Sequence, residues 1–312
     1  MNAAIVCPDC HSGLQRQSNG GLTCASGGHA FPKRSDVDVL LNDSEWDMVR
    51  RINTERSLAI DVYLPARRFP LAKDYYDWWT SRMWSKIPSG TEHVLELMCG
   101  GMELGSRMPT SVRRVACLDL NAKILEQGVR ELGPETRSRI EPVCGTAARL
   151  PFPEASFDTV FIMGGLHHVR PILKQVLGEA ARVLKPGGRF IASEPANDNW
   201  LIRAIRHWQY RTSPLQGKDE GEDGFTQKEL TAYLGESGMI LQDYERFGFV
   251  AYPLLGNMDL LPALSRSRNS ALGRWLIRFD EALEKVPILR NLAWANIFTA
   301  TKPKRSLDKK SS

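Results

Sequence analysis

Long hydrophobic runs are missing from this sequence. No window of about 18 uncharged apolar residues occurs among its 312 residues, which excludes an obvious transmembrane helix. The first residues, MNAAIVCPDC, also lack the basic segment and the long apolar stretch that begin a secretory signal. We therefore expect a protein that is neither secreted nor membrane-spanning, and we expect it to be cytoplasmic.

No charge of one sign dominates. Forty-one basic against thirty-six acidic residues leave a net charge of +5, part of it in the stretch KPKRSLDKK, and such a basic tail is usually solvated. Contact with nucleic acid or with an anionic membrane would need a clustered basic patch. The remaining composition, 42% hydrophobic and 25% charged, is that of a globular protein, and the length suits one large α/β domain with a small appendage.

Cysteine is scarce, and its six copies fall into two groups. Three of them (Cys99, Cys117 and Cys144) are scattered along apolar segments, as expected of core thiols in a reducing compartment. The other three cluster near the N-terminus, in a segment too short to bury a core of its own. Three thiolates and an imidazole suit a closed tetrahedral zinc site. The predicted ligands of a structural Zn2+ are Cys7, Cys10, Cys24 and His29, and His11 is an alternative to His29.

The chain divides into three parts by composition. Residues 1–42 form the predicted zinc ribbon, which ends in the strand-like VDVLL. Residues 43–90 have helical spacing, with Tyr75, Trp78, Trp79 and Met83 on one face, and form either a core-packing helix or a lid over a substrate pocket. The main domain is predicted over 91–312, with an insertion at about 252–290 whose segments LLGNMDLLPAL and LGRWLIRFDEAL read as amphipathic helices.

Strand and helix patterns alternate from residue 93 onward. The segments HVLELMCGG, RRVACLDL, RIEPVCG, FDTVFIMGG and RFIASEP are strand-like, and helical patterns stand between several of them. This rhythm predicts βαβ units and a parallel sheet buried on both faces. The fold class is therefore α/β, of the Rossmann-like type.

A nucleotide site is predicted where the first two of these strands end. The loop Met98-Cys99-Gly100-Gly101 is expected to lead from a strand into a helix and to point backbone N–H groups at a ligand. Asp119 ends the next strand, where a carboxylate can accept hydrogen bonds from both ribose hydroxyls. Many nucleotide-binding folds share this pair of features, so it does not identify the ligand.

The segments that follow, LPFPEASFDTVFIMGGLHHV and RVLKPGGRFIASEP, complete a set of five motifs in order. Over residues 92–195 the chain resembles the class I S-adenosylmethionine (SAM)-dependent methyltransferases, especially the quinone and sterol methylases. The N-terminal CPDCHSGL…LTCASGGHAFP resembles the ribbon of 23S rRNA guanine methyltransferases and of Trm112-like modules. The first resemblance implies a seven-stranded sheet with SAM across the carboxyl ends of its first strands.

The resemblance also implies which residues hold SAM. The methionine portion, ribose, adenine and sulfonium would be bordered by Glu96, Met98, Gly100, Gly101, Asp119, Leu120, Thr146, Ala147, Met163 and Gly164. Two departures stand out. Met98 and Met102 replace glycines that are common in the loop, and Thr146 replaces an aspartate that often accepts from the adenine amine. A hydroxyl accepts that hydrogen bond more weakly than a carboxylate.

Methyl transfer from a sulfonium needs alignment of the acceptor and exclusion of water, so a base is optional. The candidates for catalysis are His167, His168 and Glu194, with His168 preferred as base if there is one. A scaffold role for the histidine pair is the favoured alternative, and Glu194 could orient the substrate instead.

Three functions remain open. The first is SAM-dependent O- or C-methylation of a small-molecule or lipid-linked acceptor, with peripheral membrane contact through apolar residues such as Trp275, Leu276 and Phe279. The second is RNA base methylation, with the ribbon and arginine-rich segments such as RAIRHWQYR binding RNA. The third is a non-catalytic binding module with a SAM-type fold, which the altered glycine loop favours.

Overall fold

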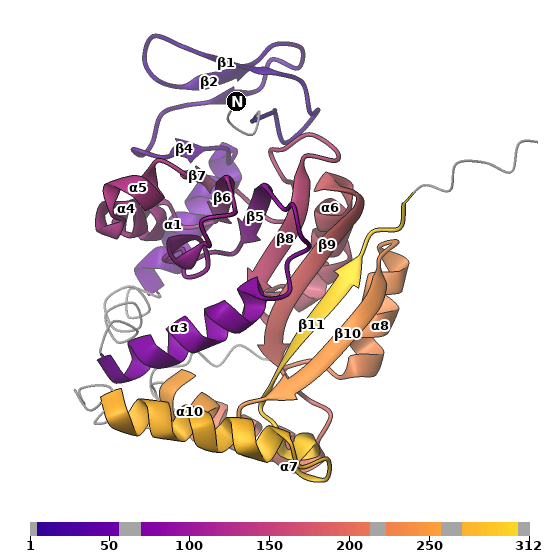
Figure 1. Cartoon of the computed structure of the whole chain (residues 1–312). Coiled ribbons are helices and arrows are strands. Elements are labelled where there is room, and N and C mark those ends of the chain that lie inside the picture. The colour runs from indigo at the N-terminus through magenta and orange to yellow at the C-terminus, as the bar shows by residue number, and fades with distance from the viewer. Residues whose placement is uncertain (1–4, 56–69, 213–222, 257–269, 305–312) are drawn as a thin grey trace, which may run out of the picture.

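A computed structural model describes residues 5–55, 70–212, 223–256 and 270–304. Its centre is an eight-stranded mixed sheet in the order β10-β11-β9-β8-β5-β6-β7-β4, and a separate three-stranded sheet, β1-β2-β3, lies at the N-terminal end (Figure 1). The strands are β1 Leu14–Arg16, β2 Leu22–Cys24, β3 Ala30–Phe31, β4 Asp38–Val39, β5 His93–Leu97, β6 Arg114–Asp119, β7 Ile140–Cys144, β8 Phe157–Met163, β9 Leu184–Pro195, β10 Ile240–Phe247 and β11 Ala295–Thr301.

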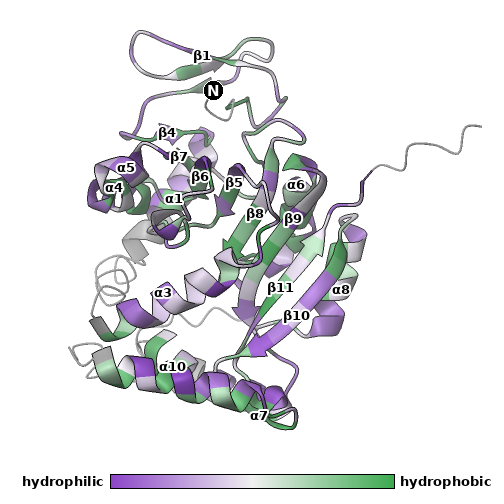
Figure 2. Ribbon diagram, viewed as in Figure 1, coloured by the Kyte–Doolittle hydropathy of each residue, from purple (hydrophilic) through white to green (hydrophobic). Residues whose placement is uncertain are grey.

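The predicted parallel sheet is confirmed. Strands β4 to β9 pair in parallel, whereas β11 runs antiparallel to both β9 and β10. The central strands β5, β6 and β8 are apolar and buried because helices cover both faces of the sheet (Figure 2). The seven strands from β7 to β10 form the sheet that the methyltransferase resemblance implies, and β4 adds an eighth at the edge.

Helices fill the connections between the strands. They are α1 Asp43–Glu55, α3 Pro70–Trp84, α4 Ala122–Glu131, α5 Pro134–Arg137, α6 Leu173–Val183, α7 Trp200–Thr212, α8 Gln227–Glu236 and α10 Ser270–Glu284. Shorter helical turns are the 3-10 helices η2 Gly105–Arg107, η3 Leu166–Ile172 and η5 Leu289–Leu292 and the π-helix η4 Tyr252–Gly256. None of the helices in the described ranges is long and apolar enough to cross a membrane.

Two hydrophobic cores lie on opposite faces of the main sheet. One contains buried residues of α6 and α8 together with residues of the N-terminal module, including Cys7 and Phe31. The other contains buried residues of α3, α4 and α10. In α3 the side chains of Tyr75, Trp79 and Met83 are buried, which favours the core-packing alternative for this helix over the lid.

Two local expectations need correction. The segment VDVLL belongs to the main sheet and not to the ribbon, because β4 pairs in parallel with β7. Its side chains alternate between the two cores, with Val39 and Leu41 in one and Leu40 in the other, as a strand buried on both faces requires. The glycine loop leads into turns and η2 instead of an α-helix, and Pro109 follows soon after η2.

The insertion at 252–290 is described only in part. Helix α10 contains LGRWLIRFDEAL, as predicted. Most of LLGNMDLLPAL lies in 257–269, outside the described residues, and its first residues belong to η4.

Candidate functional site

The predicted cofactor residues lie together at the carboxyl ends of neighbouring strands. Their loops follow β5, β6, β7 and β8, which are adjacent in the sheet. Backbone hydrogen bonds connect these loops: Cys99 N donates to Leu118 O at 3.1 Å, and Gly145 N donates to Asp119 O at 3.0 Å. The sheet order thus brings together residues that are far apart in the sequence.

The loop after β5 keeps the backbone path of a glycine loop although two of its residues are methionine. Met98, Gly100 and Met102 all have positive φ, of 52°, 49° and 62°. Left-handed backbone costs a non-glycine residue about 1–2 kcal/mol. The loop is therefore strained at both methionines, yet its backbone conformation suits the close approach of a ligand.

The two methionine side chains point to different places. Met102 is fully buried and packs against α4, where its Cε lies 3.1 Å from the position of a Cβ on Gly128. Met98 is half-buried and reaches toward the loop after β8, with its Sδ 2.9 Å from the position of a Cβ on Gly165. Met98 is thus the departure that stands beside the candidate cofactor site, and Met102 is part of the core.

Substitution by glycine should separate these two roles. Met98→Gly relieves the left-handed strain and removes a side chain that is only half-buried against the first core, so we expect the two effects to offset and the free energy of unfolding to stay within about 1 kcal/mol of wild type. Met102→Gly relieves similar strain but removes a buried side chain, and we expect a loss of roughly 2–3 kcal/mol. Urea unfolding of both variants tests the pair, and equal losses would contradict the assignment of Met102 alone to the core.

Asp119 connects the second strand to the glycine loop. Its Oδ2 accepts from Gly100 N at 2.9 Å, and its Oδ1 accepts from Asn121 N at 2.9 Å. Burial raises the pKa of this carboxyl, while the backbone donors oppose the shift. Each carboxylate oxygen has a second lone pair, so the group can still accept from a ribose hydroxyl.

Glu96 faces the loop backbone. Its Oε1 accepts from Leu104 N at 3.1 Å, and its Oε2 accepts from Gly105 N at 2.8 Å. The side chain is almost completely buried, and burial raises its pKa from the ordinary 4.5 to about 7. In this structure Glu96 holds the turn after the glycine loop, and its predicted contact with the methionine portion of SAM stays a prediction.

The raised pKa of Glu96 should make stability depend on pH. Between pH 4.5 and pH 7 the folded protein keeps a proton that the unfolded chain has released. The contribution of Glu96 is therefore complete below pH 4.5 and falls as the pH rises through 7, by about 3 kcal/mol. Urea unfolding at several pH values should show this fall in wild type and not in Glu96→Gln. The prediction would be contradicted if the difference in free energy of unfolding between wild type and Glu96→Gln stayed the same from pH 5 to pH 7.5. Glu92→Gln, at an exposed position, is the control and should show the same fall as wild type.

The remaining cofactor residues border the same edge. Thr146 is half-buried, and its hydroxyl accepts from Ala148 N at 3.3 Å within its own turn. Ala147 is buried, and Leu120 packs at the margin of the second core. Met163 ends β8, and Gly164 follows it with φ of 68°. No described contact ties the Thr146 hydroxyl to another loop, so its role toward adenine stays a prediction.

Glu194 and His167 support the loop after β8. The Glu194 carboxylate accepts from the backbone of Gly165 at 2.9 Å, Leu166 at 2.7 Å and His167 at 3.3 Å. It also lies 2.7 Å from His167 Nδ1. Both side chains are buried, which favours the scaffold alternative for His167 and indicates a supporting role for Glu194 that the sequence did not suggest. His168 is exposed, with its ring centroid 3.9 Å from that of His167, and is the catalytic candidate that a substrate could reach.

The four predicted zinc ligands meet in the N-terminal module. The sulfur atoms of Cys7, Cys10 and Cys24 and the Nδ1 or Nε2 of His29 all lie within 4.8 Å of one another. The alternative ligand His11 is exposed and stands outside this group. Three thiolates and an imidazole in a closed cluster are a donor set that fits a structural zinc ion. The group could hold a metal.

The module is attached to the cofactor side of the main domain. Val6 N donates to Pro151 O at 3.0 Å, and the guanidinium of Arg149 binds the carboxylates of Asp9 and Glu45. Asp9 lies between the first two cysteines, and Arg149 follows the turn at Thr146. Arg149 could not be recognised from the sequence, because its partners are more than 100 positions away in the chain.

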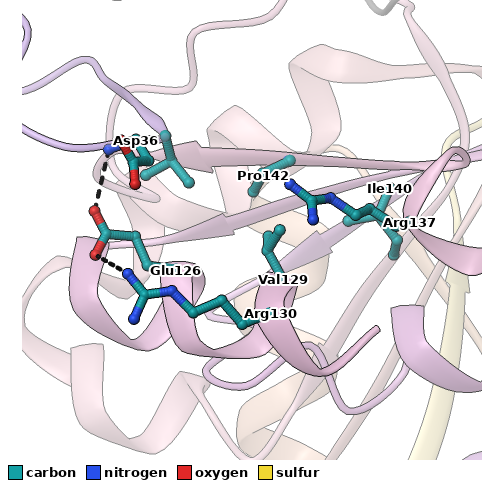
Figure 3. Close-up of a pocket in the computed structure, with 8 residues that line it drawn as sticks. Asp36, Glu126, Val129, Arg130, Arg137, Ile140 and Pro142 are labelled. Atoms are coloured by element: carbon teal, nitrogen blue, oxygen red, sulfur yellow. Dashed lines mark hydrogen bonds and ion pairs between the residues drawn. The ribbon is translucent and has the colours of Figure 1, made fainter. Parts of the chain in front are cut away.

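A pocket of about 280 Å³ lies elsewhere (Figure 3). It is lined by residues before β4, by the side of α4 that faces β7, by Arg137 of α5 and by the first part of β7, and the α4 residues include Glu126 and Arg130. Ile140 begins β7, so the pocket is at the amino end of that strand, whereas Asp119 and Thr146 follow carboxyl ends. It is separate from the candidate cofactor site.

Comparison with known proteins agrees with this geometry. The methyltransferase domain family matches residues 95–192. A "Ubiquinone/menaquinone biosynthesis C-methyltransferase UbiE" of Methylobacterium nodulans is 33% identical over 185 residues, which cover 55% of this chain and 71% of that protein. A "Demethylmenaquinone methyltransferase" of Lactococcus lactis is 29% identical over 192 residues, covering 55% and 76%. The chain belongs to the class I SAM-dependent methyltransferases.

Other relatives of this methyltransferase are matched over less of their length. The chain spans 55% of the UbiE protein of Rubrivivax gelatinosus, at 29% identity over 44% of its own length.

Solved structures confirm the fold. The [4+2]-cyclase SpnF has a TM-score of 0.51 at 18% identity, covering 73% of this chain and 81% of that one. A chain from the complex of Haloferax volcanii Trm112 with a methyltransferase has 0.52 at 17%, covering 80% and 97%. A cyclase among these shows that the fold alone does not determine the reaction.

Proposed function

We propose that this protein transfers the methyl group of SAM to a carbon atom of a small, ring-containing acceptor of the quinone type. The observation that carries the proposal is the hydrogen bond between Asp119 and Gly100, which joins the acidic strand end to the glycine loop at the carboxyl edge of the sheet. The names of the relatives support carbon as the methylated atom and a quinone precursor as the acceptor class.

Different residues of this chain would bind the cofactor, hold the loop after β8 and accept the proton. Asp119 and the backbone of the glycine loop bind the cofactor, which supplies an activated methyl group when bound. Glu194 and His167 hold the loop that carries His168. The exposed imidazole of His168 acts as the base that takes the proton the acceptor loses. The zinc cluster has a structural role.

RNA methylation and the non-catalytic module remain alternatives. The resemblance to rRNA enzymes is limited to the ribbon, whereas the relatives above act on quinone precursors by their names. Transfer of labelled methyl from SAM to a demethylmenaquinone analogue, and not to bulk RNA, is the outcome that the proposal requires.

Cofactor binding can be tested before the acceptor is identified. We expect calorimetric titration with SAM to show saturable binding, and Asp119→Ala to weaken it by about 1–3 kcal/mol because a charged hydrogen bond is lost. Asp158→Ala is the matched control, since Asp158 also accepts from backbone N–H groups but at the amino end of β8. No binding by wild type would favour the non-catalytic module, and equal weakening by the control would indicate a general effect on the fold.

A further inference from the structure

Large apolar side chains are exposed at the end of the molecule opposite the ribbon, where α7, α10 and η5 lie (Figure 1). The exposed fractions are 79% for Trp200, 65% for Trp208, 58% for Trp275 and 85% for Ile288, and Phe279 and Leu292 are also exposed. Indole rings are rarely left this open on a monomer, and clusters of such residues mark interaction surfaces.

Helix α10 has two distinct faces (Figure 2). Leu276, Ile277 and Asp280 are buried against the domain. The opposite face carries Trp275 and Phe279, one turn apart, with parallel rings at 10° and centroids 5.5 Å apart. On α7, Trp200 and Trp208 are about two turns apart and both exposed, while Arg206 is buried. Both helices therefore turn aromatic residues outward.

Basic side chains lie on the same segments as these aromatics. Arg203, Arg278, Lys285 and Arg290 are exposed on α7, on or just after α10, and in η5, and Arg274 of α10 is exposed but paired with Asp74 of α3 at 3.1 Å. Among the acids of α10, Asp280 is turned inward to accept from Phe249 N at 2.8 Å, and Glu284 pairs with Arg82 at 2.8 Å. Within the described side chains of these segments, Glu281 is the exposed carboxylate that opposes the cations.

Tryptophan and phenylalanine next to arginine and lysine are typical of helices that lie in the interface of an anionic bilayer. A second copy of the chain fits less well, because a two-fold interface would place this cationic surface against itself. Nucleic acid bases could stack on the indoles, but the aliphatic side chains of Ile288 and Leu292 neither stack on bases nor form hydrogen bonds with them.

We propose that α7, α10 and η5 form a docking face for an anionic lipid membrane. This function goes beyond methyl transfer and does not depend on the acceptor.

Co-sedimentation with vesicles tests the face directly, without SAM or acceptor. We expect the full-length protein to bind vesicles of phosphatidylcholine with phosphatidylglycerol, to bind pure phosphatidylcholine at least about tenfold more weakly, and to be released by salt. Trp200→Ala/Trp275→Ala and Arg278→Glu should each lower the partition coefficient about tenfold. All three positions are exposed, and circular dichroism with thermal unfolding checks that the variants fold.

Matched controls lie on other parts of the surface. Ile240→Ala changes an exposed apolar residue at the start of β10, and Arg130→Glu reverses an exposed charge on α4. Both should bind vesicles like wild type. The proposal would be overturned by equal binding to both kinds of vesicle, by equal losses in the controls, or by no binding at low salt. If the protein does not bind vesicles and forms a dimer that Trp275→Ala dissociates, the face would instead be an interface with a second copy of the chain.

Discussion

Cys24→Ser should abolish stoichiometric zinc binding and lower the free energy of unfolding by at least about 3 kcal/mol. Serine places a poor ligand where three thiolates and His29 converge, and it leaves an open coordination position in a closed site. Cys24 is itself buried, so the loss is not confined to the metal. Metal analysis of the purified protein and thermal unfolding measure the two effects.

The consequence should extend beyond the module. Cys7, Leu22, Cys24 and Phe31 belong to the same hydrophobic core as α6 and α8. β1 to β3 have two or three residues each and cannot stabilise a sheet alone. Without the metal, this part of the core should be exposed to water, and we expect the transition midpoint to fall by roughly 6–12 °C.

His11→Ala is the matched control for this prediction. His11 is adjacent to Cys10 but stands outside the ligand group, so the variant should keep both zinc and stability. A Cys24→Ser protein that still binds one zinc ion would contradict the assignment. Zinc loss without any change in unfolding would show that the attachment through Val6 and Arg149 is sufficient by itself.

The parts of the fold that local pattern encodes were predictable. Buried strands of four or five apolar residues, with helical periodicity between them, determine a parallel sheet, and the carboxyl ends of such strands meet at one edge. The meeting of Asp119 with the glycine loop therefore follows from the order of the elements. The four candidate zinc ligands could also be predicted from the sequence, because cysteine and histidine at this spacing in so short a segment are typical of a metal site.

The parts that depend on distant contacts could not be read from the sequence. The edge strand β4 was assigned to the ribbon because its pairing with β7 joins segments about a hundred residues apart. The side chains of Met98 and Met102 point to different places because Gly165 leaves room for Met98 and Gly128 leaves room for Met102. Neither glycine is close to the loop in sequence, so composition alone left both methionines as unexplained departures.

Glu194 is another residue whose role could not be predicted from the sequence. Its replacement should lower the free energy of unfolding strongly. Sequence position made it a candidate for catalysis or for orienting the substrate. The structure gives its carboxylate three backbone N–H donors and the ring of His167 instead. Glu194→Ala would leave these buried donors without an acceptor, and each such group costs about 1–3 kcal/mol. We expect the free energy of unfolding to fall by at least about 3 kcal/mol, and SAM binding to weaken as the loop after Gly164 loses its support.

Glu194→Gln distinguishes this support from a simple space-filling role. The amide keeps the volume of the carboxyl group but replaces one acceptor by an N–H2 donor, and both oxygens of Glu194 face N–H groups. If the donors matter, Gln should be nearly as damaging as Ala; if volume matters, it should resemble wild type. Glu229→Ala is the matched control, since Glu229 accepts from Thr226 N in a half-buried capping box and its loss should cost only about 1 kcal/mol. Losses at Glu194 no larger than this would return the residue to the candidates for contact with the substrate.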